Sequence, residues 1–428
     1  RGKAMKLTAE QEAMLAGERG ETMAKVLETL VRYGDLYGAD EMVSVTSKYN
    51  HLVTSFGLKA LGPVYELMGK LIDEGAVSQT GFSVDPRPLD DNVPASFLQK
   101  IIFKHFMYSK QDFYEGQLRE LGLMGDDAFT CTCYMDEVGN VPAMGDVLSW
   151  SESSAVVYAN SVLGARCNRN SGIIDLMGSV CGFVPRFGLL TDDGRRADWV
   201  VEVRCERRPE AQLLGSAIGM RVMADVPYIT GLDAWLGDEL DGSAKAYLKD
   251  MGAACASNGA VGLYHVEGLT PEAREQGRAL VREGAQVYVI DDAELERVRA
   301  SYPVVWKNAD AKPRLCFMGC PHMSMEQLEQ WSERIAQGLA EAGRTRVSVP
   351  CVFTAAPAVA KRFATTPAAR VLDAAGVVVS SICPLMYMNN PLSAKMPVIT
   401  NSNKLRTYSS ARYYTDDEIL DILTKGAR

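Results

Sequence analysis

Short apolar stretches alternate with amphipathic helical stretches after residue 240, and this alternation restricts the fold more than any other feature of the sequence. Helices are expected over 243–257 and 367–375, and three more are expected to begin at Thr270, Asp291 and Ser324. The strands expected among them cover 260–266, 286–290, 314–318, 347–352 and 377–382. Strands separated by helices of roughly 10 to 15 residues indicate parallel sheets with helices on both faces. We therefore predict an α/β fold of doubly wound, mostly parallel sheets.

The length of the chain predicts more than one domain. It has 428 residues, and at roughly 150 residues per domain this corresponds to two or three packed domains. We expect an N-terminal α/β region over 5–235, which holds the candidate binding segments, and a C-terminal α/β region over 236–428. Residues 1–4 precede Met5 and are interpreted as a remnant of cloning.

The charge balance excludes some classes of partner. The chain has 45 Lys and Arg against 54 Asp and Glu, a formal charge of -9, which argues against nucleic acid or an anionic membrane as its main partner. No apolar run approaches the roughly 18 residues of a membrane-spanning helix, and residues 1–30 lack the apolar core of a signal peptide. We expect a cytoplasmic protein.

Several cysteines occupy positions where a parallel sheet places ligands. Cys320 and Cys383 each follow an expected strand and precede a proline, so both thiols could point into one crevice. Cys131 and Cys133 lie in a stretch rich in β-forming residues, where alternation would aim both to the same side. Three thiolates from three distant segments can hold an iron-sulfur cluster while one iron stays open to a substrate oxygen. A zinc site of Cys131, Cys133 and Cys320, or ordinary buried thiols, are the alternatives.

The segment 150–170 combines hydroxyls, amides and two guanidinium groups, which suits the capture of a carboxylate. A helix with capped ends and solvated arginines is the alternative interpretation. Lys404 is expected in a small polar loop after a strand, where it could neutralise a carboxylate or phosphate, unless it is an ordinary surface lysine.

Histidines are few. His322 lies beside Cys320 and could act as an acid, a base or an orienting residue, or merely cap a helix. His51 and His105 show no partners in the sequence and are interpreted as structural.

Four segments together resemble one known family along nearly the whole chain. They are Leu7 to Glu18, Glu152 to Arg166, Gly319-Cys-Pro-His322, and Thr400-Asn-Ser followed by Lys404. On these motifs the chain resembles the aconitase X family, the outlying branch of the aconitase superfamily. The resemblance implies an aconitase-like fold and an iron-sulfur dehydratase that removes water from a small 3-hydroxy acid.

The resemblance also implies roles for particular residues. The cluster cysteines would be Cys131, Cys320 and Cys383, and Lys404 and His322 would be catalytic. The substrate-binding residues would be Ser47, Asp85, Pro86, Ser153, Ser154 and Lys404, and the polar segment 150–170 adds Asn160 and Arg166 to them. In the family the base looks to be a serine on a small swivelling domain, which we expect to be absent from this chain. A small partner subunit is therefore implied, and the chain alone should be inactive.

Some positions depart from the family pattern and bear on the substrate. Residues 47–52 read Ser-Lys-Tyr-Asn-His-Leu where the family usually has a sequence like Ser-Ala-His-Val-Ser-Gly, and Cys133 stands where the family usually has proline. Asp85 replaces a neutral amide, and its carboxylate would repel a phosphate and favour an ammonium or imino group. Of the family's substrates this favours cis-3-hydroxy-L-proline, or a related amino acid, over mevalonate 5-phosphate. A degenerate, non-catalytic binding subunit is a further alternative.

Overall fold

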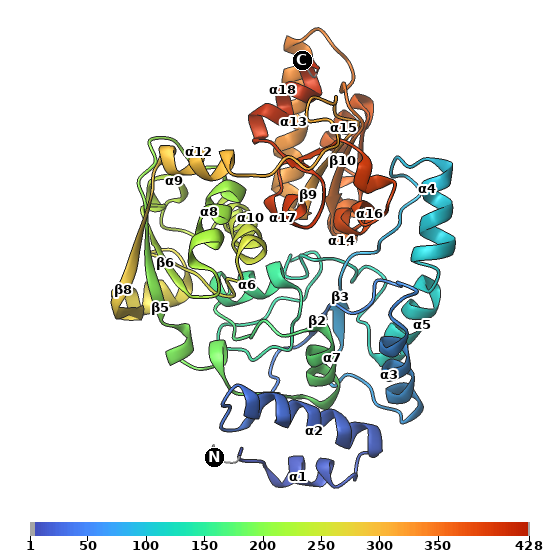
Figure 1. The fold of residues 1–428 in the computed structure, drawn as a ribbon, viewed down its shortest axis with the longest axis vertical. Helices are drawn as coiled ribbons and strands as arrows, with labels where there is room; N and C mark the ends of the chain where they lie inside the picture. Colours follow the sequence, from blue (N-terminus) through green and yellow to red (C-terminus); the bar gives the residue numbers. More distant parts are fainter. Residues whose placement is uncertain (1–4, 427–428) are drawn as a thin grey trace.

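Two parallel sheets organise the chain after residue 196 in the computed structural model, which describes residues 5–426 (Figure 1). One sheet has the order β7-β6-β5-β8 and the other the order β11-β10-β9-β12-β13, with all neighbours parallel. The strands of the first are β5 (Ala197–Val203), β6 (Pro227–Thr230), β7 (His265–Val266) and β8 (Val281–Ile290). Those of the second are β9 (Leu315–Met323), β10 (Cys351–Ala355), β11 (Val377–Ser380), β12 (Val398–Thr400) and β13 (Arg412–Tyr413). In each sheet the chain begins at an inner strand and winds to both sides, so the predicted doubly wound fold is confirmed.

The boundaries of some elements differ from the sequence-based expectation. The expected boundary between residues 235 and 236 falls inside the first sheet, between β6 and β7. β9 runs on through Cys320, and Lys404 lies in a helix rather than a loop. Residues 131–133 form no strand, although their side chains favour one. Residues 1–4, interpreted as a cloning remnant, lie outside the described part of the chain.

The N-terminal part packs helices around two small sheets (Figure 1, blue to green). β1 (Met42–Ser44) pairs antiparallel with β4 (Phe183–Pro185), and β2 (Asn50–Leu52) pairs parallel with β3 (Phe82–Val84). The helices are α1 (Ala9–Leu15), α2 (Glu21–Leu36), α3 (Gly62–Asp73), α4 (Phe97–Ile101), α5 (Gln111–Leu121) and α7 (Gly172–Cys181). His51 lies in β2 and Asp85 directly follows β3, so this strand pair positions two of the segments that the sequence singled out.

Helix α6 (Ser153–Ser161) lies at the centre of the molecule, between the N-terminal part and the two larger sheets with their helices (Figure 1). Every residue of α6 after Ser153 is buried, which small and apolar side chains all round the helix permit. α10 (Gly242–Asn258) contacts α6, α8 (Ala211–Val222) and α17 (Asn403–Tyr408), and so links the central helix to both larger sheets. A Cβ atom on Gly215 of α8 would lie 2.1 Å from the Met251 carbonyl oxygen, so the close approach of α8 to α10 requires glycine there.

The remaining helices cover the two larger sheets. Those of the first sheet are α9 (Asp233–Leu236), α11 (Pro271–Gln276) and α12 (Asp292–Ala300). Those of the second are α13 (Met325–Glu341), α14 (Pro357–Phe363), α15 (Pro367–Ala375), α16 (Pro384–Met388) and α18 (Asp416–Lys425). Within residues 5–426, none of these or the other helices combines the length and the apolar character needed to cross a membrane.

Gly319 of β9 allows the strand to lie close against Thr354 of β10, where the pairing of the two strands is irregular. Its φ is +100°, and a Cβ atom there would lie 2.4 Å from the Thr354 carbonyl oxygen. We expect Gly319→Ala to lower the free energy of unfolding by about 1–3 kcal/mol more than Gly343→Ala, as measured by urea denaturation. Gly343 is the matched control because it also has a positive φ, of +64°, but its added Cβ would meet nothing within 4 Å. Equal losses in the two variants would contradict this account.

Candidate functional site

A buried ion pair between Lys404 and Glu152 lies at the centre of the candidate site. Lys404 is the second residue of α17, just beyond the carboxyl end of β12, and Glu152 is the N-cap of α6. The Lys404 ammonium donates to Glu152 Oε1 and, over 3.2 Å, to Ser154 Oγ. Glu152 Oε2 accepts from the Ser154 hydroxyl at 2.6 Å and from the Ala155 N–H at 2.7 Å. Both carboxylate oxygens are thus satisfied.

The two partners keep each other charged. Burial by itself would lower the pKa of Lys404, but Glu152, Cys320 and Cys131 outweigh it and raise the pKa well above the usual value. Burial would also raise the pKa of Glu152, and Lys404 reverses that shift and lowers it. Lys404 is therefore held as a cation, which suits it to attract an anion rather than to accept a proton.

Three of the predicted cysteines lie within electrostatic reach of this cation. Burial raises the pKa of the Cys131, Cys320 and Cys383 thiols, and Lys404 acts in the opposite direction on each of them. Cys320 in turn raises the pKa of both Cys131 and Cys383. Cys320 and Lys404 come from β9 and the end of β12, neighbouring strands on either side of the point where the sheet reverses its winding direction. Open α/β sheets bind ligands at such a point.

The arrangement fits an iron-sulfur cluster better than a single metal ion. Thiolates from separate segments are the donor set of such clusters, and Cys131, Cys320 and Cys383 would supply three of them. Within residues 5–426, no three His, Cys, Asp or Glu side chains lie close enough to share one ion. Cys133, proposed as a zinc ligand in the alternative interpretation, instead lies beside His51, whose pKa it raises. The zinc alternative is therefore not supported.

His322 is fully buried among the cysteine segments. Its Nδ1 is 3.0 Å from Thr130 Oγ1, and its Nε2 is 3.1 Å from the Ile382 carbonyl oxygen. Its backbone N–H donates to Cys131 Sγ over 3.4 Å. Burial lowers the pKa of His322 to about 4. With both ring nitrogens occupied, His322 has no free nitrogen for a substrate, so of the three roles expected for it the geometry favours orientation over acid or base.

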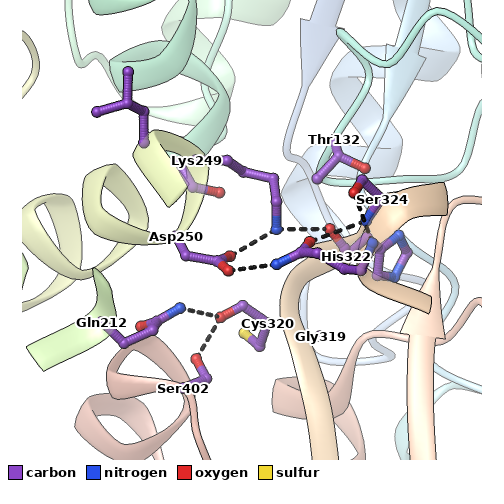
Figure 2. A network of polar contacts seen from close by, with 12 residues as sticks. Thr132, Gln212, Lys249, Asp250, Gly319, Cys320, His322, Ser324 and Ser402 are labelled. Atoms are coloured by element: carbon purple, nitrogen blue, oxygen red, sulfur yellow. Dashed lines mark hydrogen bonds and ion pairs between the residues drawn. The ribbon is translucent and has the colours of Figure 1, made fainter. Parts of the chain in front are cut away.

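Polar side chains from the first sheet's helices hold the backbone around Cys320 (Figure 2). Lys249, fully buried on α10, donates to the His322 carbonyl oxygen at 3.1 Å and to Asp250 at 2.6 Å. The Cys320 carbonyl oxygen accepts from Gln212 of α8 at 3.4 Å and from the Ser402 hydroxyl. A cleft of about 480 Å³ opens beside this network and touches Cys320, Lys249 and Gln212, but not Lys404. These contacts join helices α8 and α10 of the first sheet to strand β9 of the second sheet.

Asp85 and His51 form a second charged pair near the ion pair. His51 Nε2 and Asp85 Oδ1 are 3.7 Å apart, and neither has a hydrogen-bond partner within the described residues, although both atoms are buried. His51 Nδ1 contacts Ser83 Oγ at 2.9 Å. Burial would lower the pKa of His51, but Cys133 and Asp85 outweigh it and raise the pKa to about 10. Burial raises the pKa of Asp85, which His51 and Lys404 counteract.

The other expected binding residues divide into two groups. Ser154 contacts the ion pair directly, Ser153 begins α6 beside it, and Pro86 is buried next to Asp85. Ser47 is buried with a hydroxyl that has no partner within residues 5–426. These residues remain candidates for contact with a substrate.

Asn160 and Arg166 form hydrogen bonds within the protein. The Asn160 amide donates to the Cys167 and Gly262 carbonyl oxygens, at 2.8 Å each, and its oxygen accepts from the Cys167 N–H and from Arg195. Arg166 forms an ion pair with Asp192 at 2.5 Å and donates to the Leu190 carbonyl oxygen. The polar groups of both residues are thus engaged by the protein itself, and a role in substrate binding stays a prediction for each.

Arg169 is the second guanidinium group of the segment 150–170 and was not among the expected binding residues. Its Nη1 is buried without a hydrogen-bond partner inside the described part of the chain. Burial lowers the pKa of Arg169, and the negative charge of Glu152 acts on it in the opposite direction, so the guanidinium lies within electrostatic reach of the ion pair. His51 was likewise missed as part of the site. In the sequence, nothing separates Arg169 from Arg166, because the absence of a partner is visible only in the fold.

Three family models match nearly the whole chain. They are described as the first domain of aconitase X, which matches residues 4–193, the second domain, which matches 197–300, and the third domain, which matches 313–417. The second match runs from the start of β5 to the end of α12, and so includes the whole four-stranded sheet.

Curated proteins of two kinds are similar to this chain. The phosphomevalonate dehydratase large subunit of Methanothermobacter thermautotrophicus is 35% identical over 378 residues, which cover 87% of this chain and 86% of that protein. The protein of the same name from Thermococcus kodakarensis is 32% identical over 358 residues, 83% of this chain and 82% of that protein. A cis-3-hydroxy-L-proline dehydratase of Hypocrea jecorina is 25% identical over 359 residues, 82% of this chain but 56% of that protein.

A solved structure has the same fold. The crystal structure of Thermococcus kodakaraensis aconitase X in its holo form superimposes with a TM-score of 0.79 and 27% sequence identity, and covers 98% of this chain and 100% of that one.

The stability of the protein should depend on the buried Lys404–Glu152 pair. Lys404→Met leaves the Glu152 carboxylate buried without a cation and should lower the free energy of unfolding by about 3–5 kcal/mol in urea denaturation. The double variant with Glu152→Gln should lose less than the sum of the two single losses, because neither charge is then left unpaired. Lys361→Met is the control, since its ion pair with Asp127 is exposed and should contribute little. Additive losses in the double variant would argue against a coupled pair.

Proposed function

This chain belongs to the aconitase X family, and from that membership we propose that it is the large subunit of a hydro-lyase that removes water from a small 3-hydroxy acid. The observation that supports this most is the gathering of Cys131, Cys320 and Cys383 around the buried Lys404. Relatives at 32% and 35% identity are named dehydratase large subunits, which agrees with the proposal.

The cysteines and the cation have distinct roles in this proposal. Cys131, Cys320 and Cys383 would hold an iron-sulfur cluster, which supplies a Lewis acid for the departing hydroxyl oxygen when it is bound. Lys404 attracts the substrate carboxylate, because Glu152 keeps it an ammonium. Ser154, which bridges the pair, offers a hydroxyl beside that carboxylate. A protonated Lys404 cannot remove the α-proton, so we assign the base to the small subunit.

The charges of the site bear on which acid is dehydrated. The preference for an amino or imino acid assumed a free carboxylate at Asp85. In the fold His51 and Lys404 act on that carboxylate together with the negative charge of Glu152, so the two cations balance the two carboxylates. Arg169 adds a guanidinium without a hydrogen-bond partner for its buried Nη1. We therefore propose a 3-hydroxy acid with a second anionic group, of which mevalonate 5-phosphate is the first to test, and this replaces the earlier preference for cis-3-hydroxy-L-proline.

Metal content tests the cluster. Anaerobically purified and reconstituted chain should contain iron and acid-labile sulfide and show a visible absorption band, and Cys383→Ser should lose both the iron and the dehydration measured with the small subunit. Cys181→Ser is the matched control, because Cys181 is buried in the N-terminal core and its Sγ contacts the Phe183 carbonyl oxygen. Reconstituted chain without iron, or a fully active Cys383→Ser variant, would refute the cluster assignment.

The role of Arg169 can be tested by comparing substrates. With the small subunit present, Arg169→Gln should raise the KM for mevalonate 5-phosphate by roughly 10- to 100-fold, the effect of losing one charged hydrogen bond. The KM for mevalonate, which lacks the phosphate, should change little. Arg166→Gln should leave both unchanged, because Arg166 pairs with Asp192 at the surface. If wild-type protein dehydrates cis-3-hydroxy-L-proline but neither of the mevalonates, the second-anion proposal fails and the dehydratase proposal stands.

A further inference from the structure

His322 contacts all three cysteine segments at once. Its Nδ1 reaches Thr130, the neighbour of Cys131, and its Nε2 reaches the carbonyl oxygen of Ile382, the neighbour of Cys383. Its own backbone N–H donates to Cys131 Sγ, and it lies two residues after Cys320. One side chain thus connects positions that are 192 and 60 residues away along the chain.

The hydrogen-bond directions follow from the chemistry of the partners. A carbonyl oxygen can only accept, so Nε2 carries the proton and donates to Ile382. Nδ1 is then an acceptor, and the Thr130 hydroxyl donates to it. Thr130 Oγ1 keeps capacity to accept from the Thr132 N–H at 3.0 Å and contacts the Thr132 hydroxyl at 3.1 Å. Each of the two hydrogen bonds of the imidazole therefore has a defined donor and acceptor. Together they specify one orientation of the ring.

The segments have few other ties to one another. The Cys383 N–H donates to the Arg87 carbonyl oxygen, which anchors that loop to the N-terminal part. The Cys320 carbonyl oxygen is held by Gln212 and Ser402, from α8 and the N-cap of α17. Arg87 links the Cys383 loop to the Cys131 segment indirectly, since its guanidinium lies 3.8 Å from the Phe129 ring centroid. The imidazole of His322 links the two segments directly, through a hydrogen bond to each. Outer groups that fix the ligands of a metal centre commonly change its affinity by about 10- to 100-fold.

We propose that His322 is a positioning residue that holds the three cysteine segments in place in the cluster-free chain. The thiols would then lie in the positions that cluster binding requires. The inference rests on the proposed function only for the identity of the bound group. The contacts themselves involve only residues of this chain, and so they can be tested without that group.

The test measures thiol reactivity residue by residue. The cluster-free full-length chain is treated with N-ethylmaleimide, and the modification rate of each cysteine is followed by peptide mass spectrometry. His322→Leu removes both side-chain bonds and should speed the modification of Cys131 and Cys383 by about tenfold. His322→Gln can still place an amide N–H near Ile382, and so should release Cys131 more than Cys383. His322→Asn can still accept from Thr130 and should show the reverse order.

Two further measurements separate positioning from a general loss of stability. His265→Leu removes another buried imidazole, whose Nε2 contacts the Arg195 carbonyl oxygen at 2.8 Å in the first sheet's domain, and should leave the rates at Cys131 and Cys383 unchanged. In reconstituted protein, His322→Leu should shorten the lifetime of the visible cluster absorption by about tenfold. A uniform rate increase at all ten cysteines, or unchanged rates at Cys131 and Cys383, would overturn the inference. If the expected pattern appears but no variant or wild type takes up iron, the inference stands and the proposed cluster fails.

Discussion

The candidate site depends on the buried ion pair between Lys404 and Glu152. Taking two charges out of water costs several kcal/mol for each, and only a short contact with further hydrogen bonds repays it. Here the Ser154 hydroxyl and the Ala155 N–H complete the coordination of the carboxylate. Because Glu152 caps the central helix α6 and Lys404 begins α17, the pair also ties the N-terminal part to the second large sheet. The same contact therefore joins two parts of the fold and holds the cation that we propose for substrate binding.

Burial and charge act in opposite directions on the cysteines around this pair. A buried thiol resists ionisation, and burial raises the pKa of Cys131, Cys320 and Cys383 accordingly. Metal binding requires the thiolates, so uptake of a cluster releases protons. Lys404 favours the thiolate at each of the three positions. In the proposed enzyme, the cation that would attract the substrate carboxylate would thus also offset part of the cost of ionising these thiols, against the opposing charge of Glu152 at Cys131 and Cys320.

The sequence located part of this site. Cys131, Cys320, Cys383 and Lys404 were identified from their resemblance to a family motif, and the fold brings these four residues together. Arg166 and Asn160 were selected because their segment is rich in polar groups, yet the fold uses them internally. Arg169 and His51 were passed over, because a buried polar atom without a partner has no signature in the sequence. Composition can suggest which segment binds, but the direction of each side chain depends on its neighbours.

By itself, the sequence determined the fold class and the winding of the larger sheets. Hydrophobic periodicity and turn residues are local properties, and parallel strands joined through helices have few topologies open to them. Only the tertiary structure decided which carboxylate meets which cation and which residues His322 connects. These contacts join residues as far as 252 positions apart, and nothing in the local pattern specifies them. The compensation of Asp85 by His51 has the same origin, since it arises from the pairing of two strands that lie 32 positions apart.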